Sequence, residues 1–404
     1  MTRRSVVMAL ADARPIRREV FRASPRAGVA VMAFAWYTDA KRNHLMSIEQ
    51  HWTRSDTIDV AYVRHSRDNG RTWSDPVERK TGERTPQGML RRHLRGGWVE
   101  PRSGKFIEIW NEGVLETDDP LEGLRQWKIY YRVGADPRVR VARAAGHTEA
   151  HPFPRVWRGK NSVMLGDSGY NSVTLGDGTI LLPVTVAPLD AAGKLYNPAG
   201  GYTHHDAAVL RGRWRGREIE WEMSAPIQGD PSRVTRGMDE PSIARLEGKR
   251  LMLVMRGSND KRPADAAYKW VSYSVDDGRA WTAPVPWTYT DGGAFFSPSA
   301  CSQLVPHSSG RLFWLGNVTP ENPRGNRPRY PLVIGEVERS SGRLLRETVR
   351  VVDDKQPDDD ALLTLSNFYA REDRESKEIA LHMTRLFALS SGWRGDAFLY
   401  RIPV

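Results

Sequence analysis

The octapeptide Ser66-Arg67-Asp68-Asn69-Gly70-Arg71-Thr72-Trp73 returns further along the chain as Ser274-Val275-Asp276-Asp277-Gly278-Arg279-Ala280-Trp281. Each copy follows an apolar, β-branched run and precedes a proline by a few residues, which is typical of strand, tight turn and strand. We therefore predict that both copies are hairpin tips. In each copy the glycine would adopt positive φ, the first aspartate would accept hydrogen bonds from turn amides, and the tryptophan would pack as an apolar plug beneath the turn.

Three further hairpins share this shape, with two short apolar runs joined by a turn at Asp177-Gly178, Glu247-Gly248-Lys249 or Ser309-Gly310. Recurring hairpins, with no long helical periodicity, indicate an all-β chain built from one repeated unit. Because all-β toroids often exceed the usual domain length as one unit, we expect a single domain over residues 1–404.

The spacing Ser-x-Asp-x-Gly-x-Thr-Trp is that of the Asp box, or BNR repeat, and on this motif the sequence resembles the sialidase (neuraminidase) superfamily of β-propellers. The resemblance implies a six-bladed β-propeller with long loops on one face, although seven blades would also fit the length. Gly134-Ala135-Asp136 resembles a decayed third copy. Tyr400-Arg401-Ile402-Pro403 copies a sialidase signature at the wrong end of the chain, so we expect it to be the strand that closes the ring. In that family the Asp box is structural, and function has to be argued from other residues.

The formal net charge is +11, from 60 basic and 49 acidic side chains. This excess favours an anionic partner, and an acidic carbohydrate is our expectation. We expect no nucleic-acid partner because no basic block interleaved with aromatic residues occurs. We expect no membrane association because no stretch approaches the roughly 20 apolar residues of a membrane span.

The single cysteine, Cys301, cannot form an internal disulfide, so nothing requires an oxidising compartment. The apolar run from Val6 to Ala11 is short for a secretory signal, and we expect a cytoplasmic protein. There is no Walker loop, no Rossmann glycine fingerprint and no cysteine-based zinc site, so no cofactor or metal is expected. His204 and His205 are adjacent, and neighbours on a strand face opposite sides, which disfavours a shared metal site.

The segment Asp239-Glu240-Pro241 through Met255-Arg256-Gly257 resembles the sialidase segment in which a glutamate opens the inner strand of a blade and an arginine ends the next strand. Hairpin pairing would bring Glu240 and Arg256 to one end of the central channel. The resemblance implies that Glu240 is a base toward a tyrosine nucleophile and that Arg256 is one of three arginines that clamp a carboxylate. A guanidinium suits this task because its planar fork binds a carboxylate bidentately. The alternative is an exposed pair at a hairpin end.

The other two clamp arginines are implied by weaker similarities. An Asn317-Val318-Thr319-Pro320 turn before a later strand resembles the segment of the third clamp arginine and implies Arg329, with Arg324 and Arg327 as alternatives. An echo of the first clamp segment in Val20-Phe21-Arg22 implies Arg22, with Arg26 beside it.

The loop before the first hairpin tip resembles the sialidase loop that presents the acid/base aspartate, which implies Asp56. A carboxyl group can protonate a glycosidic oxygen when burial keeps its pKa near the working pH. His51 precedes Asp56 and is a second candidate acid or base. Both could instead be solvent-facing residues.

The sequence departs from the sialidase pattern at two positions. Leu365 stands where the nucleophilic tyrosine belongs, and Met383 stands where a glutamate should orient the first clamp arginine. A leucine cannot attack a sugar, so the retaining sialidase mechanism is absent or rebuilt. Tyr369 could substitute if its loop turned it inward, and the alternative is a packing or surface role.

These residues support three functional hypotheses. The first is a sialidase-like glycoside hydrolase that cleaves a terminal acidic sugar, with Asp56 as the acid. The second is a uronate-glycan lyase or glycosidase that uses His51 or a tyrosine to abstract a proton. The third, favoured by the missing tyrosine, is a glycan-binding propeller without catalytic activity.

Overall fold

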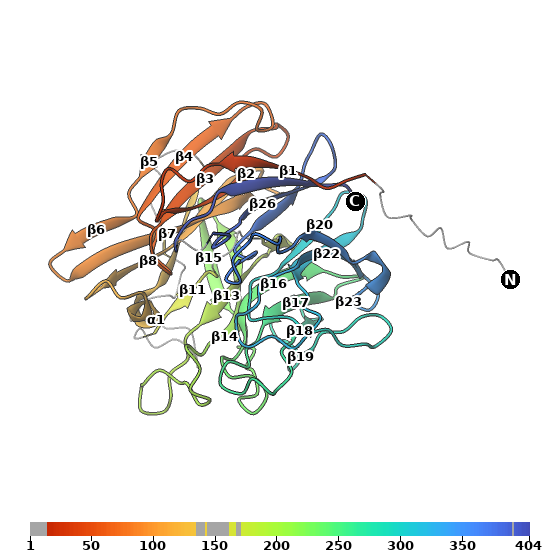
Figure 1. Cartoon of the computed structure of the whole chain (residues 1–404). Coiled ribbons are helices and arrows are strands. Elements are labelled where there is room, and N and C mark those ends of the chain that lie inside the picture. Colours follow the sequence, from red (N-terminus) through yellow and green to blue (C-terminus); the bar gives the residue numbers. More distant parts are fainter. Residues whose placement is uncertain (1–13, 135–141, 144–160, 167–170, 390–391) are drawn as a thin grey trace.

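The computed structural model describes residues 14–134, 142–143, 161–166, 171–389 and 392–404. In this described part, six antiparallel sheets surround a common axis as a six-bladed β-propeller (Figure 1). Strands take 47% of the chain and helices 3%, so the predicted all-β class and six blades are confirmed. Among these same residues no helix has the length and apolar character needed to cross a bilayer.

The first blade contains β2 (Ala30–Tyr37), β3 (Leu45–Trp52), β4 (Val60–Ser66) and β5 (Val77–Arg79). The second contains β6 (Gly82–Thr85), β7 (Gly88–Val99), β8 (Phe106–Leu115), β9 (Lys128–Val133) and β10 (Ala142–Arg143). The third contains β11 (Val163–Met164), β12 (Val173–Thr174), β13 (Ile180–Val186), β14 (Asp206–Arg215) and β15 (Glu218–Met223). The short helices are η1 (Pro120–Glu122), α1 (Gly123–Gln126) and η2 (Arg346–Thr348).

The fourth blade contains β16 (Asp239–Arg245), β17 (Leu251–Arg256), β18 (Lys269–Ser274) and β19 (Val285–Pro286). The fifth contains β20 (Gln303–Pro306), β21 (Leu312–Asn317), β22 (Leu332–Glu338), β23 (Arg343–Leu344) and β24 (Arg350–Asp353). The sixth contains β25 (Tyr369–Glu372), β26 (Ile379–Thr384), β27 (Ala397–Ile402) and β1 (Arg17–Arg22).

Strands near the axis contact the blades on both sides. β16 contacts β13 and β20, and β2 contacts β7 and β26. Residues 30–36 of β2 are all buried, because neighbouring blades cover both faces of the strand. This double coverage explains why such strands read as continuous apolar runs. Polar residues at the ends of these strands and in the adjoining loops are therefore the ones that open onto the axis.

The ring closes where the two ends of the described chain pair. β1 adds to β27 as the outermost strand of the last sheet, with Arg17 opposite Arg401 and Val20 opposite Phe398 (Figure 1). β27 contains Tyr400, Arg401 and Ile402, so the predicted closing strand is confirmed, and it ends just before Pro403. Ion pairs reinforce the seam, since Arg17 Nη2 lies 3.0 Å from Glu378 Oε1.

Both octapeptides form the predicted turns. Gly70 and Gly278 have φ of 85° and 77°. The amide of Thr72 donates to Asp68 at 2.9 Å, and the amide of Ala280 donates to Asp276 at 3.0 Å. The two tryptophans are half-buried, so the predicted plugs cover the turns only in part. Residues 135–136 of the decayed copy and the apolar run at residues 6–11 lie outside the described residues.

Candidate active site

Residues from all six blades or their loops converge on one hollow. Two adjoining cavities of about 110 Å³ and about 420 Å³ share four lining residues, which are Asp56, Tyr202, Arg236 and Arg256. The first cavity continues to side chains of the second and third blades, and the second continues to those of the fifth and sixth. Because the blades surround a common axis, side chains from all of them can meet only near that axis.

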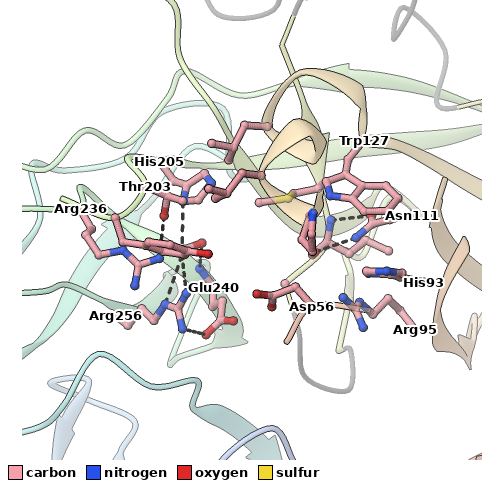
Figure 2. Close-up of a pocket in the computed structure, with 18 residues that line it drawn as sticks. Asp56, His93, Arg95, Asn111, Trp127, Thr203, His205, Arg236, Glu240 and Arg256 are labelled. Atoms are coloured by element: carbon pink, nitrogen blue, oxygen red, sulfur yellow. Dashed lines mark hydrogen bonds and ion pairs between the residues drawn. The ribbon is translucent and has the colours of Figure 1, made fainter. Parts of the chain in front are cut away.

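Arg256 ends β17 at the centre of a buried ion-pair group. Its Nε and Nη2 donate to Asp239 Oδ2 at 3.2 and 2.8 Å, and its Nη1 lies 3.0 Å from Glu240 Oε2 (Figure 2). Neighbours on a regular strand face opposite sides, but the register of β16 shifts between Asp239 and Ser242, and Glu240 has φ of 45°. This bulge turns both carboxylates toward one guanidinium.

The charges around Asp239 hold it ionised. Burial alone would raise the pKa of this carboxyl, but Arg256, His205 and Arg236 outweigh burial and keep the pKa well below its ordinary value. Arg256 is therefore supported by a permanent anion, and its guanidinium is fixed in one orientation at the wall of the hollow.

Arg236 and Arg329 are two further cations that line the hollow with Arg256, and Arg95 and Arg327 also reach its walls. Arg236 Nη2 donates to Thr203 Oγ1 at 2.6 Å, and Arg329 Nη2 donates to the carbonyl of Ser299 at 3.0 Å. Burial and then Arg256 lower the pKa of Arg236, and the same two causes lower that of Arg329 to about 10. The buried Nε of each makes no hydrogen bond to the described residues. An anion bound between the three guanidinium groups would relieve their mutual repulsion.

Asp56 faces this cluster from the loop between β3 and β4. Its carboxylate accepts a hydrogen bond from Ser55 Oγ at 2.7 Å, and it lines both cavities. Figure 2 shows it between the Glu240–Arg256 pair and the side chains of His93 and Arg95. Its φ is 54°, a conformation that is uncommon for residues other than glycine and that clusters at functional sites.

The far wall of the smaller cavity carries neutral groups together with Arg95. The His93 ring lies 4.5 Å from that of Trp127, and burial followed by Arg95 lowers the pKa of His93 well below its ordinary value. The Asn111 side chain donates to the Leu165 carbonyl at 3.0 Å and accepts from the Leu165 amide at 2.9 Å. A neutral imidazole beside an aromatic ring suits contact with a sugar hydroxyl and a sugar face, so this wall complements the charged wall opposite.

Five of the residues that the sequence implied line the hollow: Asp56, Glu240, Arg256, Arg329 and Arg327, the last of which was an alternative to Arg329. Arg22 and His51 do not. Arg22 lies on β1, the outermost strand of its sheet, where it pairs with Glu49 at 3.4 Å and stacks on Phe21. His51 lies within β3 rather than in the loop, and its Nε2 is 2.9 Å from Glu49. Trp52 lines the hollow, so the alternation of a strand points His51 away from it.

Tyr369 is a packing residue. It begins β25 with its ring 5.1 Å from that of Trp36, in the apolar layer between the last and first blades. Burial raises the pKa of its phenol. A phenol whose proton is held more tightly than usual is a poor nucleophile, so Tyr369 does not replace the missing tyrosine.

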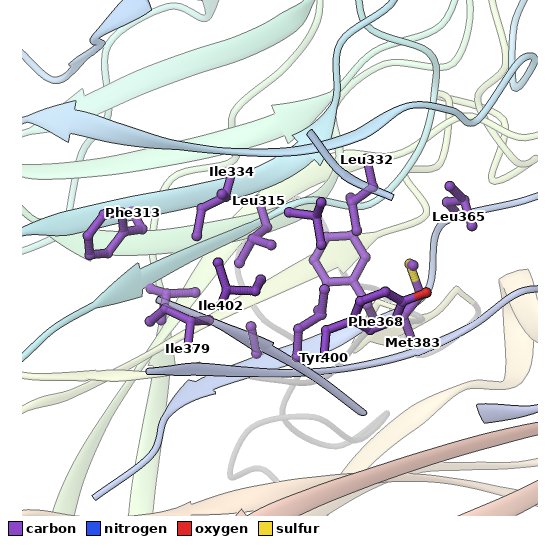
Figure 3. Packing of buried hydrophobic residues seen from close by; sticks show 14 of the residues in the cluster. Phe313, Leu315, Leu332, Ile334, Leu365, Phe368, Ile379, Met383, Tyr400 and Ile402 are labelled. Carbon is purple, nitrogen blue, oxygen red and sulfur yellow. The ribbon is translucent and has the colours of Figure 1, made fainter. Parts of the chain in front are cut away.

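Leu365 and Met383, at the two positions that depart from the sialidase pattern, are both fully buried in one apolar cluster (Figure 3). Phe368 and Tyr400 belong to the same cluster. The chain turns polar groups toward the hollow on either side of Leu365, at Thr364 and Ser366. The position that the resemblance assigns to the nucleophile is therefore part of the hydrophobic core.

We predict that Leu365→Tyr gives no gain of activity and lowers the free energy of unfolding by about 1–3 kcal/mol. The larger side chain would overpack the cluster and bury a hydroxyl group. Urea denaturation measures the loss, and Leu365→Met, which keeps the volume, should cost less than about 1.5 kcal/mol. Equal stability of the tyrosine variant and the parent protein would contradict the packing argument.

Sequence reasoning missed Arg236 and Tyr202. Both lie in loops that lead into central strands and carry no repeated motif, and the Arg236 guanidinium lies 5.6 Å from the Tyr202 ring. The available signal for Arg236 was its place just before Gly237, whose φ is 66°, at the entry to β16.

His205 also lines the hollow, with Nδ1 3.4 Å from Asp239. His204 lies instead beside Tyr196, with ring centroids 5.2 Å apart, so the two histidines do not share a site. Within the described ranges, no group of three His, Cys, Asp or Glu side chains could hold a metal ion.

Solved structures with the same architecture include two sialidases. The Hadza microbial sialidase Hz136 has a TM-score of 0.59 and 13% identity, with 93% of this chain and 66% of that chain covered. The Trypanosoma rangeli sialidase in complex with 2,3-difluorosialic acid has a TM-score of 0.59 and 12% identity, covering 97% and 59%. The chain thus spans less than two thirds of the length of either sialidase.

A GH93 α-L-arabinofuranosidase of Fusarium graminearum in complex with arabinobiose has a TM-score of 0.52 and 12% identity, with 95% of this chain and 96% of that chain covered. No protein-family model and no curated protein matches the sequence. At these identities the likeness establishes the fold, which is that of the sialidase-like six-bladed propellers.

Proposed function

We propose that this protein is a glycoside hydrolase that removes a terminal sugar carrying a carboxylate, such as sialic acid or a uronic acid, from a glycan. The supporting observation is the meeting of Arg236, Arg256 and Arg329 with Asp56 on one hollow. Three guanidinium groups on one cavity favour a carboxylate because each can form charge-assisted hydrogen bonds with it.

The reaction would use two carboxyl groups, as most glycosidases do. Asp56, protonated, would donate its proton to the departing glycosidic oxygen. Glu240, whose Oε2 is fixed 3.0 Å from Arg256, would act from the other wall as the base for a water molecule or as the nucleophile. This assignment needs no tyrosine nucleophile, in keeping with the burial of Leu365.

Other functions make different demands on the same residues. A lyase would need a proton abstractor, and since His51 points away from the hollow, Tyr202, His205 or Glu240 would have to serve. A neutral pentofuranoside, of the kind in the arabinofuranosidase complex, would leave the three arginines without an anionic partner. A lectin would bind without turnover.

The test is a set of glycosides offered to the full chain: sialosides, uronides, the methyl esters of both, and an α-L-arabinofuranoside. We expect release of the acidic sugar and little turnover of the esters, which have lost the charge. Cleavage of the arabinofuranoside alone, an unsaturated product, or binding without turnover would each replace the proposal by the corresponding alternative.

We predict that Arg329→Met raises KM for the acidic glycoside by about 10- to 100-fold and changes kcat less, because a charge-assisted hydrogen bond contributes about 1.5–3 kcal/mol. Steady-state kinetics measures both constants. Arg324→Met is the matched control, since Arg324 is exposed on the same segment. An equal effect of both variants would exclude a specific role for Arg329.

A further inference from the structure

Lys269 is a buried lysine directly behind the arginine cluster. It begins β18 opposite Arg256 in the register of β17 and β18, and it has 0% exposed surface. Its Nζ donates hydrogen bonds to the carbonyls of Ala300 and Pro298, the latter at 3.5 Å. A fully buried lysine is rare unless it is paired, and here its hydrogen bonds go to a backbone turn.

That same turn orients Arg329. Its middle carbonyl, from Ser299, accepts the hydrogen bond of Arg329 Nη2 at 3.0 Å. The Ser299 amide donates to the Gly325 carbonyl at 2.8 Å. Lys269 and Arg329 thus hold one short backbone segment from two sides, and a displacement of the turn would move the guanidinium that faces the hollow.

We propose that Lys269 is the positioning residue of the arginine cluster, and that its proton controls how tightly the site holds a carboxylate. This inference rests on the proposed function, because it concerns the affinity for the acidic sugar. A charged ammonium would hold the turn in place and add a fourth positive charge behind Arg256 and Arg329. The neutral amine would keep the packing but lose that charge.

Burial and the charged neighbours of Lys269 bring its pKa near neutrality. Burial is the main cause that lowers the pKa of Lys269. Arg256 and Arg329 also lower it, while Cys301 and Glu240 raise it, and the net pKa is about 7. A bound carboxylate favours the charged form and so raises this pKa. Affinity should therefore be highest at pH 6, fall as the pH rises through about 7, and level off at higher pH.

The experiment is calorimetric titration of the full chain with the methyl glycoside of sialic acid and with its methyl ester, from pH 6 to 9. For a pKa increase of about one unit on binding, affinity for the acid should fall by up to about tenfold over this range. Titrations near pH 7 in buffers of different ionisation enthalpy should show proton uptake. The ester should show neither effect.

Two variants test whether Lys269 causes the pH dependence of the affinity. Lys269→Met should bind the acid at pH 6 about as weakly as the parent protein does at pH 9, with no pH step and no proton uptake. Cys301→Ala removes the thiol beside Lys269 and should keep the step. If the methionine variant fails to fold, the absence of proton uptake by the parent protein would still overturn the proposal.

The outcomes separate the two proposals. Carboxylate binding with constant affinity and no proton uptake would overturn the role of Lys269 and leave the proposed function standing. A step that persists in Lys269→Met would also overturn it. Failure of both the sialoside and a methyl uronide, titrated in the same way, to bind even at pH 6 would overturn both.

Discussion

Asp56→Asn should lower kcat for an acidic glycoside with an alkyl leaving group by about 10²- to 10⁴-fold, the usual contribution of a positioned acid. Asparagine has the size of aspartate but cannot give up a proton to the glycosidic oxygen. It also tolerates the positive φ of 54° at this position, so the loop should keep its shape. KM should change little because the arginine cluster is intact.

The leaving group makes this prediction specific. An activated aryl glycoside departs with little help from an acid, so Asp56→Asn should slow its hydrolysis much less than that of an alkyl glycoside. Asp59→Asn is the matched control, since Asp59 ends the same loop and accepts a hydrogen bond from the Thr53 amide at 2.8 Å. Equal losses on both substrates, or unchanged rates, would remove Asp56 from the role of acid.

The residues that could be predicted from the sequence are those tied to the repeated hairpin. Glu240 and Arg256 lie at matching ends of two paired strands, so the pattern of strands was enough to bring them together. Asp56 and Arg329 were implied by the resemblance to sialidase segments, and each lies just before a strand of another blade. Their places at strand ends fit residues that open onto the axis.

Two predicted site residues, Arg22 and His51, lie away from the hollow, and each position has a physical cause. Arg22 was assigned by local similarity, but closure of the ring makes β1 the outermost strand of its sheet, the position furthest from the axis. His51 was assigned to a loop, but β3 continues to Trp52, and the alternation of side chains then turns His51 outward. Neither the closure nor the exact end of a strand can be read from a short motif.

The paired carboxylates show a further limit. A regular strand would place Asp239 and Glu240 on opposite faces, and the bulge at Glu240 overrides that rule. The positive φ of 45° is maintained because the ion pairs with Arg256 offset its cost. A local departure of this kind depends on contacts with another strand, so the local sequence alone does not reveal it.

Arg256→Met should lower the free energy of unfolding at pH 7 by about 3–5 kcal/mol, in addition to weakening carboxylate binding. The side chains of Asp239 and Glu240 are each 5% exposed, and the substitution would leave two buried negative charges without their main partner. Urea denaturation with an unchanged m-value would measure this loss.

The pH dependence of this loss identifies its origin. In the parent protein the pKa of Asp239 is depressed, so its ion pair contributes stability above the ordinary aspartate pKa, and that contribution is lost as the pH falls through the lower folded value. Without Arg256 the pKa of Asp239 should rise, and the deficit of the variant should shrink between pH 7 and pH 5. Arg256→Met combined with Asp239→Asn should recover roughly half of the loss at pH 7 by removing one uncompensated charge. A deficit that is independent of pH and unaffected by the second substitution would instead indicate lost packing of the arginine side chain.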